Sequence, residues 1–133
     1  MNFDSRIAHG LLRIVTGLMF WQHGARKLFG WLGGTAVDSW FSWPFGVAGI
    51  LEFFGGILIL IGFRTRSVAF LLSGEMAVVY WWRHFAWDAF WPIVNRGEGP
   101  VLFSFIFFFL WAAGPGAFSV DGMLAKGGEA NGE

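Results

Sequence analysis

The chain contains no cysteine among its 133 residues. Disulfide bonds, cysteine-ligated zinc, iron–sulfur clusters and dithiol redox chemistry are therefore excluded from its own side chains. Charged residues are also scarce, at 14% against about 25% in an ordinary soluble domain, and the net charge is zero. Because no basic run is available to bind phosphates, the sequence predicts no nucleic-acid partner.

Apolar residues take the place of the missing charges. Hydrophobic residues make up 56% of the chain and aromatic residues 20%. A soluble domain of this size has too much surface for its volume to bury so many apolar side chains. A bilayer removes this difficulty, because side chains that face outward are then also allowed to be apolar. The composition therefore predicts an integral membrane protein.

Four continuous apolar segments follow one another along the chain. They cover residues 5–24, 45–63, 67–85 and 99–114. A helix needs about 20 residues to cross a bilayer, whereas transmembrane β-strands alternate polar and apolar residues over about ten. The continuous pattern predicts an all-α fold, a bundle of four transmembrane helices in a single domain at residues 1–120. The polar, glycine-rich residues 121–133 are predicted to form a disordered tail.

The connection between the second and third segments is very short. It consists of Arg64-Thr65-Arg66, whereas the connections after the first and third segments are long and aromatic. Four crossings place both termini on the side of this basic turn. The numbers of lysines and arginines near the helix ends are equal on the two sides, so the turn itself favours cytoplasmic termini.

Three ionisable residues fall inside the predicted membrane helices, namely Arg13, Glu52 and Glu75. At about 1.5 Å of rise per residue, all three lie about 10–16 Å from the side of the short turn. A lone charge at the bilayer centre costs at least about 2.5–3.5 kcal/mol. We therefore expect the three to meet, with Arg13 between the two carboxylates. Such a cluster is either a proton-handling or ligand-binding site, or a buried ion-pair network that fixes the helix register.

A second group of polar side chains lies near the long loops. Its members are His23, Lys27, Arg83, His84, Asn95 and Glu98. The two histidines are candidates for haem ligation, although interfacial histidines more often only form hydrogen bonds. Polar groups among aromatic residues are typical of a site for a flat ligand such as a quinone head group, and equally of an ordinary interfacial belt. No spacing of His, Asp or Glu indicates a metal site.

Several short motifs occur in a fixed order along the chain. They are His23-Gly24-Ala25-Arg26-Lys27-Leu28, Glu52-Phe53-Phe54-Gly55-Gly56, Gly62-Phe63-Arg64-Thr65-Arg66, Asn95-Arg96-Gly97-Glu98 and Gly114-Pro115-Gly116-Ala117-Phe118-Ser119-Val120-Asp121. In this order they resemble the motifs of the DoxX family of small membrane proteins. Arg13 also matches an arginine in the first helix of that family. Glu75 and His84 have no counterpart that we identify in the family pattern.

The resemblance implies a four-helix bundle in a prokaryotic plasma membrane and a link to quinone-dependent oxidoreductases. No flavin or nicotinamide fold fits into four membrane helices, so electrons would pass through the quinone pool, a haem or a partner protein. The first hypothesis is therefore a quinone-interacting subunit of an oxidoreductase system. In it, Arg13, Glu52 and Glu75 form the internal site, and His23 and Lys27 contact the head group.

Two other classes of function are open at this point. A charged interior in a short bundle is also typical of a proton-coupled or anion transporter or channel, which at this size would need a homo-oligomer. The third hypothesis is a non-catalytic membrane anchor for a soluble redox enzyme. Replacing Glu52 by Gln would abolish uptake by a transporter and would leave the complex of an anchor intact.

Overall fold

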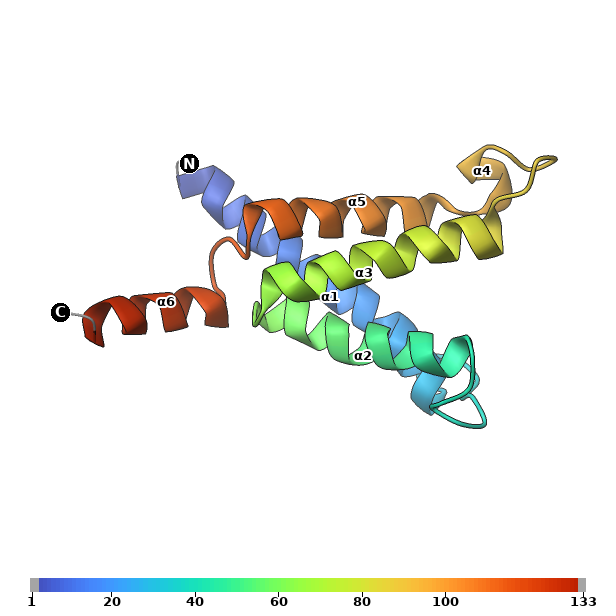
Figure 1. Ribbon diagram of the computed structural model, residues 1–133, viewed down its shortest axis with the longest axis horizontal. Helices are drawn as coiled ribbons and strands as arrows, with labels where there is room; N and C mark the ends of the chain where they lie inside the picture. The colour runs from blue at the N-terminus through green and yellow to red at the C-terminus, as the bar shows by residue number, and fades with distance from the viewer. Residues whose placement is uncertain (1–2, 132–133) are drawn as a thin grey trace.

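The computed structural model describes residues 3–131 and has an all-α fold (Figure 1). The long helices are α1 (Phe3–Phe29), α2 (Phe45–Ile61), α3 (Thr65–Val79) and α5 (Glu98–Ala113). A π-helical turn, η1 (Tyr80–His84), extends α3, and α4 (Pro92–Asn95) and α6 (Val120–Asn131) are shorter. The described residues contain no β-strand, only an isolated bridge between Ala86 and Ala89. The prediction of an all-α fold is therefore confirmed.

The helix bounds follow the predicted apolar segments closely, with one large difference. Helix α1 has 27 residues and continues through Lys27 to Phe29, well beyond the predicted end. The third segment is divided between α3 and η1, and it ends at His84. Among residues 3–131, none of the helices combines the length and the apolar character that crossing a membrane requires.

The long helices are arranged as two pairs. Helix α1 packs along α2 and α3 packs along α5, whereas α1 touches α5 only slightly. The two pairs lie close together near the N-terminus of α1 and the start of α6, and they diverge in the opposite direction (Figure 1). We call the first region, with residues 62–64 and 114–119, the closed end. The region with residues 30–44 and 85–97 is the open end.

Glycines bring α1 and α2 into backbone contact. A Cβ atom on Gly24 would lie 2.2 Å from the backbone nitrogen of Phe53, and one on Gly17 would lie 2.5 Å from that of Leu60. A larger residue at either position would force the two helices apart. This is the close approach that the small residues of these helices predict, because small side chains let backbones meet.

The apolar core joins the two pairs. Phe20 of α1 meets Phe107 of α5 edge-on, with 4.9 Å between the ring centroids, and both side chains are almost completely buried. Between α3 and α5, Ser73 and Ser104 each donate a hydrogen bond to the backbone carbonyl of the other, at 2.8 and 3.0 Å. These contacts hold the second pair together in the region where the pairs begin to diverge.

The predicted disorder of the tail is wrong for residues 121–131, which belong to α6 (Val120–Asn131). The Ser119 hydroxyl accepts a hydrogen bond from the backbone N–H of Gly122 at 2.9 Å, so this serine caps the helix. Asp121 lies in the first turn, where a negative charge stabilises a helix. The low hydrophobicity of the tail suggested disorder, but its capping residues specify a helix start. Residues 132–133 of the predicted tail lie outside the described residues.

Candidate functional site

Arg13 is completely buried at the closed end. Its guanidinium donates hydrogen bonds to the backbone carbonyl oxygens of Pro115 at 2.8 Å, Ala117 at 3.2 Å and Phe118 at 2.7 Å. One turn earlier on α1, the Nε2 atom of His9 donates to the carbonyl oxygen of Gly114 at 2.8 Å. The two side chains therefore fasten the segment 114–118 across the end of α1.

The structure does not bring Arg13 to Glu52 and Glu75, which corrects the predicted cluster of three. A Cβ atom on Gly62 would lie 2.9 Å from the Arg13 guanidinium. Gly62 comes ten residues after Glu52, a separation of about 15 Å along a helix axis. The predicted cluster was based on the depths of the Cα atoms of these three residues along their helices, without the direction of their side chains. Helical side chains lean toward the N-terminus of their helix, so the long Arg13 side chain points to the closed end and away from the carboxylates.

Asp121 completes the contacts of the closed end. Its two carboxylate oxygens accept hydrogen bonds from the backbone N–H groups of Arg64 and Thr65, at 2.8 and 2.9 Å. These N–H groups open α3, so a distant residue supplies the cap that α3 does not obtain from its own N-cap side chain. Burial would raise the pKa of Asp121, but the hydrogen bonds from Thr65 and Arg64 and the charge of Arg13 lower this pKa below its ordinary value.

The charged pair of the open end joins α1 to α2. The Lys27 ammonium lies 2.5 Å from a carboxylate oxygen of Glu52. The Glu52 side chain is 4% exposed, whereas that of Lys27 is 29% exposed. The sequence assigned Lys27 to a separate polar group near the loops, and Arg13 to the carboxylates. In the structure, Lys27 takes the place beside Glu52 that the sequence assigned to Arg13. It reaches Glu52 because α1 continues as a helix past Lys27.

Glu75 of α3 faces the same pair from across the gap between the helix pairs. Both of its carboxylate oxygens are buried, and neither accepts a hydrogen bond from a donor group in the described part of the chain, while the Glu52 carboxylate lies within interaction distance. A buried polar group without a partner is costly. A proton, or a ligand that donates a hydrogen bond, would relieve this cost. Glu75 is therefore the side chain of this region that is most in need of a further partner.

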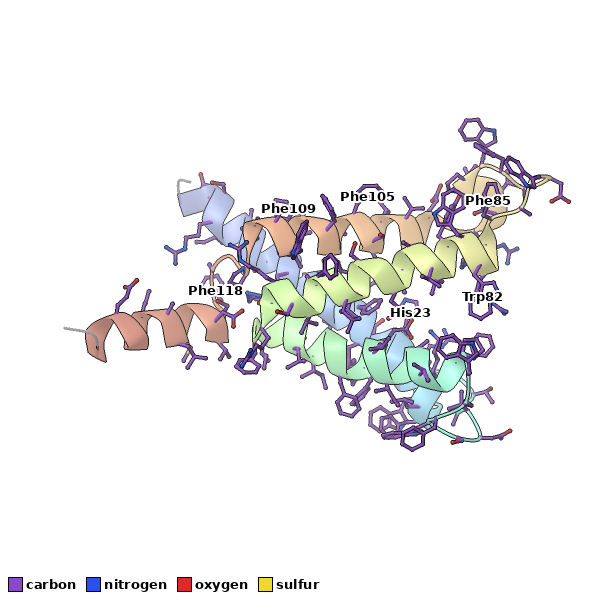
Figure 2. The ribbon with its side chains drawn as sticks, viewed as in Figure 1. His23, Trp82, Phe85, Phe105, Phe109 and Phe118 are labelled. Carbon is purple, nitrogen blue, oxygen red and sulfur yellow. The ribbon has the colours of Figure 1, made fainter. Side chains whose placement is uncertain are left out.

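Two cavities adjoin the Lys27–Glu52 pair. The polar cavity has a volume of about 320 Å³, and its walls include His23, His84 and Arg96. The apolar cavity has a volume of about 150 Å³ and lies between α2 and α3, and its walls include Trp43, Phe45, Leu51, Glu75, Val78, Trp82 and Arg83. Figure 2 shows His23 and Trp82 in the region where the two helix pairs diverge.

The π-helical turn directs two predicted site residues into different cavities. Arg83 lines the apolar cavity, with its guanidinium carbon 4.9 Å from the centroid of the Phe45 ring. His84 lines the polar cavity, and its Nδ1 atom donates to the carbonyl oxygen of Asn95 at 3.1 Å. Turns of this kind are rare and frequently lie at functional sites. The apolar pattern of the sequence contains no sign of it.

Asn95, another predicted ligand-binding residue, lines neither of these two cavities. Its side-chain amide donates to the carbonyl oxygen of Ala89 at 3.0 Å, and its side-chain oxygen accepts from the N–H of Gly97 at 2.8 Å. Asn95 therefore positions the loop that carries its neighbour Arg96. Arg96 lines the polar cavity and was missed, although it lies inside one of the motifs that the sequence singled out.

The polar cavity fits a single substituted ring. Its volume of about 320 Å³ is at the lower end of the range of ordinary ligand pockets, about 300–1,000 Å³. A haem, considered from the sequence for His23 and His84, is much larger than one substituted ring, so the cavity favours the smaller ligand. Among the residues that the structure describes, no group of three or more His, Asp or Glu side chains is placed to hold a metal ion.

Comparison with known proteins identifies the family of the chain. The sequence model of the DoxX family matches residues 9–85. An "Uncharacterized protein" of Haemophilus influenzae is 38% identical over 119 residues, which are 86% of this chain and 89% of that protein. "Putative oxidoreductase CatD" of Bacillus subtilis is 32% identical over 79 residues, 55% of this chain and 57% of that protein. No solved structure matches. The chain belongs to the DoxX family.

Proposed function

We propose that the chain is an integral membrane protein, a four-helix transmembrane bundle. The DoxX family is generally membrane-associated. Large apolar side chains on the long helices point outward, and Val15, Leu71, Leu102 and Phe105 are each more than half exposed. In water, such exposure costs about 25 cal/mol for each Å². In hydrocarbon this cost vanishes, because lipid tails are as apolar as the side chains.

The two ends of the bundle support an orientation. Tryptophan side chains gather at the open end, where Trp31, Trp43, Trp81, Trp82, Trp87 and Trp91 are all at least 50% exposed. Such a belt is typical of a membrane–water interface. The closed end carries Arg64 and Arg66, whose positive charges favour the cytoplasmic side. Both termini are then cytoplasmic, in a prokaryotic plasma membrane.

The polar cavity is proposed to bind the head group of a quinone, as part of a membrane oxidoreductase system. The observation that carries this proposal is its lining: rings of Phe20 and Phe103 beside the nitrogens of His23 and Arg96, in a volume that fits one substituted ring. A quinone presents a flat face to aromatic rings and two carbonyl oxygens to hydrogen-bond donors. A relative of this chain is named an oxidoreductase.

The two glutamates are proposed to handle protons for this ring. Full reduction of a quinone adds two electrons and two protons, and the electrons would come from a soluble redox partner. Glu52 lines both cavities, and Glu75 lines the apolar one. A carboxyl group beside the ring is able to pass a proton to a ring oxygen. The proton route then runs from Glu75 through Glu52 to the polar cavity.

Quinone binding to the purified protein tests the proposal. We expect a dimethoxy-methyl-benzoquinone without a side chain to quench tryptophan fluorescence in lipid nanodiscs. Arg96→Ala and His23→Ala are each expected to weaken this binding about tenfold, because each removes a donor to a carbonyl oxygen. Arg6→Ala, an exposed arginine of α1, is the matched control and should bind as the wild type does. No saturable quenching in the wild type would refute the proposal.

A proton-coupled or anion transporter is the second candidate. It is favoured by one observation, that the Lys27–Glu52 pair lines two separate cavities. Transport requires a site that is reached from two sides in turn. Uptake into liposomes that is lost in Glu52→Gln, together with no quinone binding, would favour transport. A complex with a soluble enzyme that survives Glu52→Gln with full activity would instead indicate a membrane anchor.

A further inference from the structure

The polar and the apolar cavity have a common boundary. Lys27, Glu52 and Val79 line both of them. The boundary therefore consists of one charged pair and one small apolar side chain. A molecule that fills the polar cavity reaches the apolar cavity by extending past Val79, beside the Lys27–Glu52 pair.

The apolar cavity opens outward through the seam between α2 and α3. Leu51 of α2 and Val78 of α3 belong to its walls, and helices α2 and α3 pack less extensively than either helix pair. The rings of Trp43 and Trp82 lie beside the same cavity, with 6.2 Å between their centroids. Val78, Trp43 and Trp82 are all more than half exposed. The seam therefore leads to the outer surface of the helices.

Volume and polarity assign different parts of one ligand to the two cavities. The apolar cavity, at about 150 Å³, has the volume of an apolar cavity that holds one benzene-sized group. The remaining wall of the polar cavity carries His23, His84 and Arg96 beside apolar residues, whereas the surface of the apolar cavity is almost entirely apolar, although Glu75 and Arg83 belong to its walls. A hydrocarbon chain against these groups would leave their nitrogens without hydrogen-bond partners, which is unfavourable. A chain attached to the bound ring therefore has its best route through the seam.

We propose that the ligand of this site carries an apolar chain, which passes through the apolar cavity and leaves the bundle between α2 and α3. This inference rests on the proposed function and names the substrate class: a lipid-soluble quinone with a chain, in place of a small water-soluble quinone. The Lys27–Glu52 pair then lies at the junction of ring and chain. The chain enters the lipid at the surface that the proposed function places in the membrane.

Closing the seam with a large side chain tests the route. Ala48 lines the apolar cavity, so Ala48→Phe places a ring where the chain would pass. Ala77→Phe is the matched control, because Ala77 lines a separate cavity of about 260 Å³ beside α5. The two probes are the dimethoxy-methyl-benzoquinone without a side chain and the same ring bearing a decyl chain. Both are titrated by tryptophan quenching in nanodiscs, at equal mole fractions in the lipid.

The two probes should respond differently to the closed seam. Ala48→Phe is expected to weaken binding of the decyl probe about tenfold and to leave binding of the bare ring within about twofold. Ala77→Phe should change neither. Should Ala48→Phe fail to fold, Val78→Phe closes the same seam from α3 and carries the same expectation.

Failure of the inference is distinguishable from failure of the proposed function. If the bare ring binds and Ala48→Phe weakens both probes equally, or neither, the chain route is wrong and the quinone site stands. If the wild type binds neither probe, the proposed function fails and the route fails with it. Native mass spectrometry provides a further outcome. If Ala48→Phe displaces a bound phospholipid and leaves binding of the decyl probe unchanged, a lipid chain occupies the seam, and the proposed route is overturned.

Discussion

The closed and the open end of the molecule treat buried polar groups in different ways. At the closed end, Arg13 and Asp121 bond to backbone carbonyl and N–H groups. At the open end, Lys27 and Glu52 bond to each other, and within residues 3–131 the buried Glu75 carboxylate accepts no hydrogen bond from a donor group and has Glu52 as its charged neighbour. Backbone partners are present whenever the chain is folded. A side chain that is bonded to another side chain is able to move away from it and bind a ligand or a proton instead.

The closed and the open end also differ in how tightly their residues pack. At the closed end, a Cβ atom on Gly116 would lie 2.8 Å from the ring of His9, so the segment 114–118 packs tightly against α1 there. At the open end, the Lys27–Glu52 pair adjoins two cavities. The comparison teaches that a buried charge alone does not identify a site. The partners of that charge, and the space beside it, distinguish a structural residue from a candidate functional one.

The largest expected effect lies at the closed end, in Arg13→Met. Losing the guanidinium leaves the carbonyl groups of Pro115, Ala117 and Phe118 without their donor. We expect the free energy of unfolding to fall by about 3 kcal/mol or more. Thermal unfolding in detergent, followed by circular dichroism, measures this loss.

Two further variants control the Arg13 experiment. Arg6→Met, on the exposed face of α1, should change the free energy of unfolding by less than about 0.5 kcal/mol. Arg13→Lys should restore only part of the loss, because an ammonium lacks the fork that reaches three carbonyls. An Arg13→Met protein as stable as the wild type but unable to bind quinone would erase the distinction between the two ends.

A smaller effect is expected for Asp121→Asn, about 1 kcal/mol, because an amide accepts fewer N–H groups at the start of α3 than a carboxylate does. The pKa of Asp121 is lowered in the folded protein from an ordinary value of 3.8. Its stabilisation is therefore complete above pH 3.8 and is lost as the pH falls through the lowered pKa. Thermal midpoints of the two proteins should converge over this acid range. A difference that stays constant there would mean that the Asp121 charge does not stabilise the fold.

The smallest effect on stability is expected at the open end, for Glu75→Leu. Replacing a buried carboxyl group that lacks a partner should leave the free energy of unfolding unchanged or raise it by about 1 kcal/mol. The rate of proton uptake that accompanies quinone reduction should fall in the same variant, while two protons are still taken up for each quinone reduced. Glu52→Leu is the contrasting variant, because it leaves Lys27 unpaired and should destabilise the protein. Strong destabilisation by Glu75→Leu would show that Glu75 supports the structure, as Arg13 does.

Much of the fold was predictable because apolar runs and turns are local features. The predicted segments 45–63, 67–85 and 99–114 lie within a few residues of α2, α3 with η1, and α5. The end of α1 was placed five residues too early, because Arg26 and Lys27 end the apolar pattern without ending the helix. Helix α6 was missed because the prediction relied on the polar composition of the tail. The local signal for a helix start, the capping residue Ser119, was given too little weight.

The residues of the candidate site were easier to predict than their grouping. His23, Lys27, Glu52, Glu75, Arg83 and His84 were all singled out in the sequence, and all of them line the two cavities. Their rarity in an apolar chain made them visible. Arg13 was grouped with the carboxylates, because depth along a helix says nothing about the direction in which a long side chain extends.

By itself, the sequence determined which residues are helical and which few polar side chains had to be explained, because hydrophobicity and helix propensity act over short stretches of chain. The tertiary structure decided which cation meets Glu52. Arg13 is taken by carbonyl groups more than 100 residues further along the chain, and this leaves Lys27 for the carboxylate. That choice depends on how segment 114–118 folds back over the closed end and on how far the helix pairs diverge. Neither of these is recorded in the local pattern of residues.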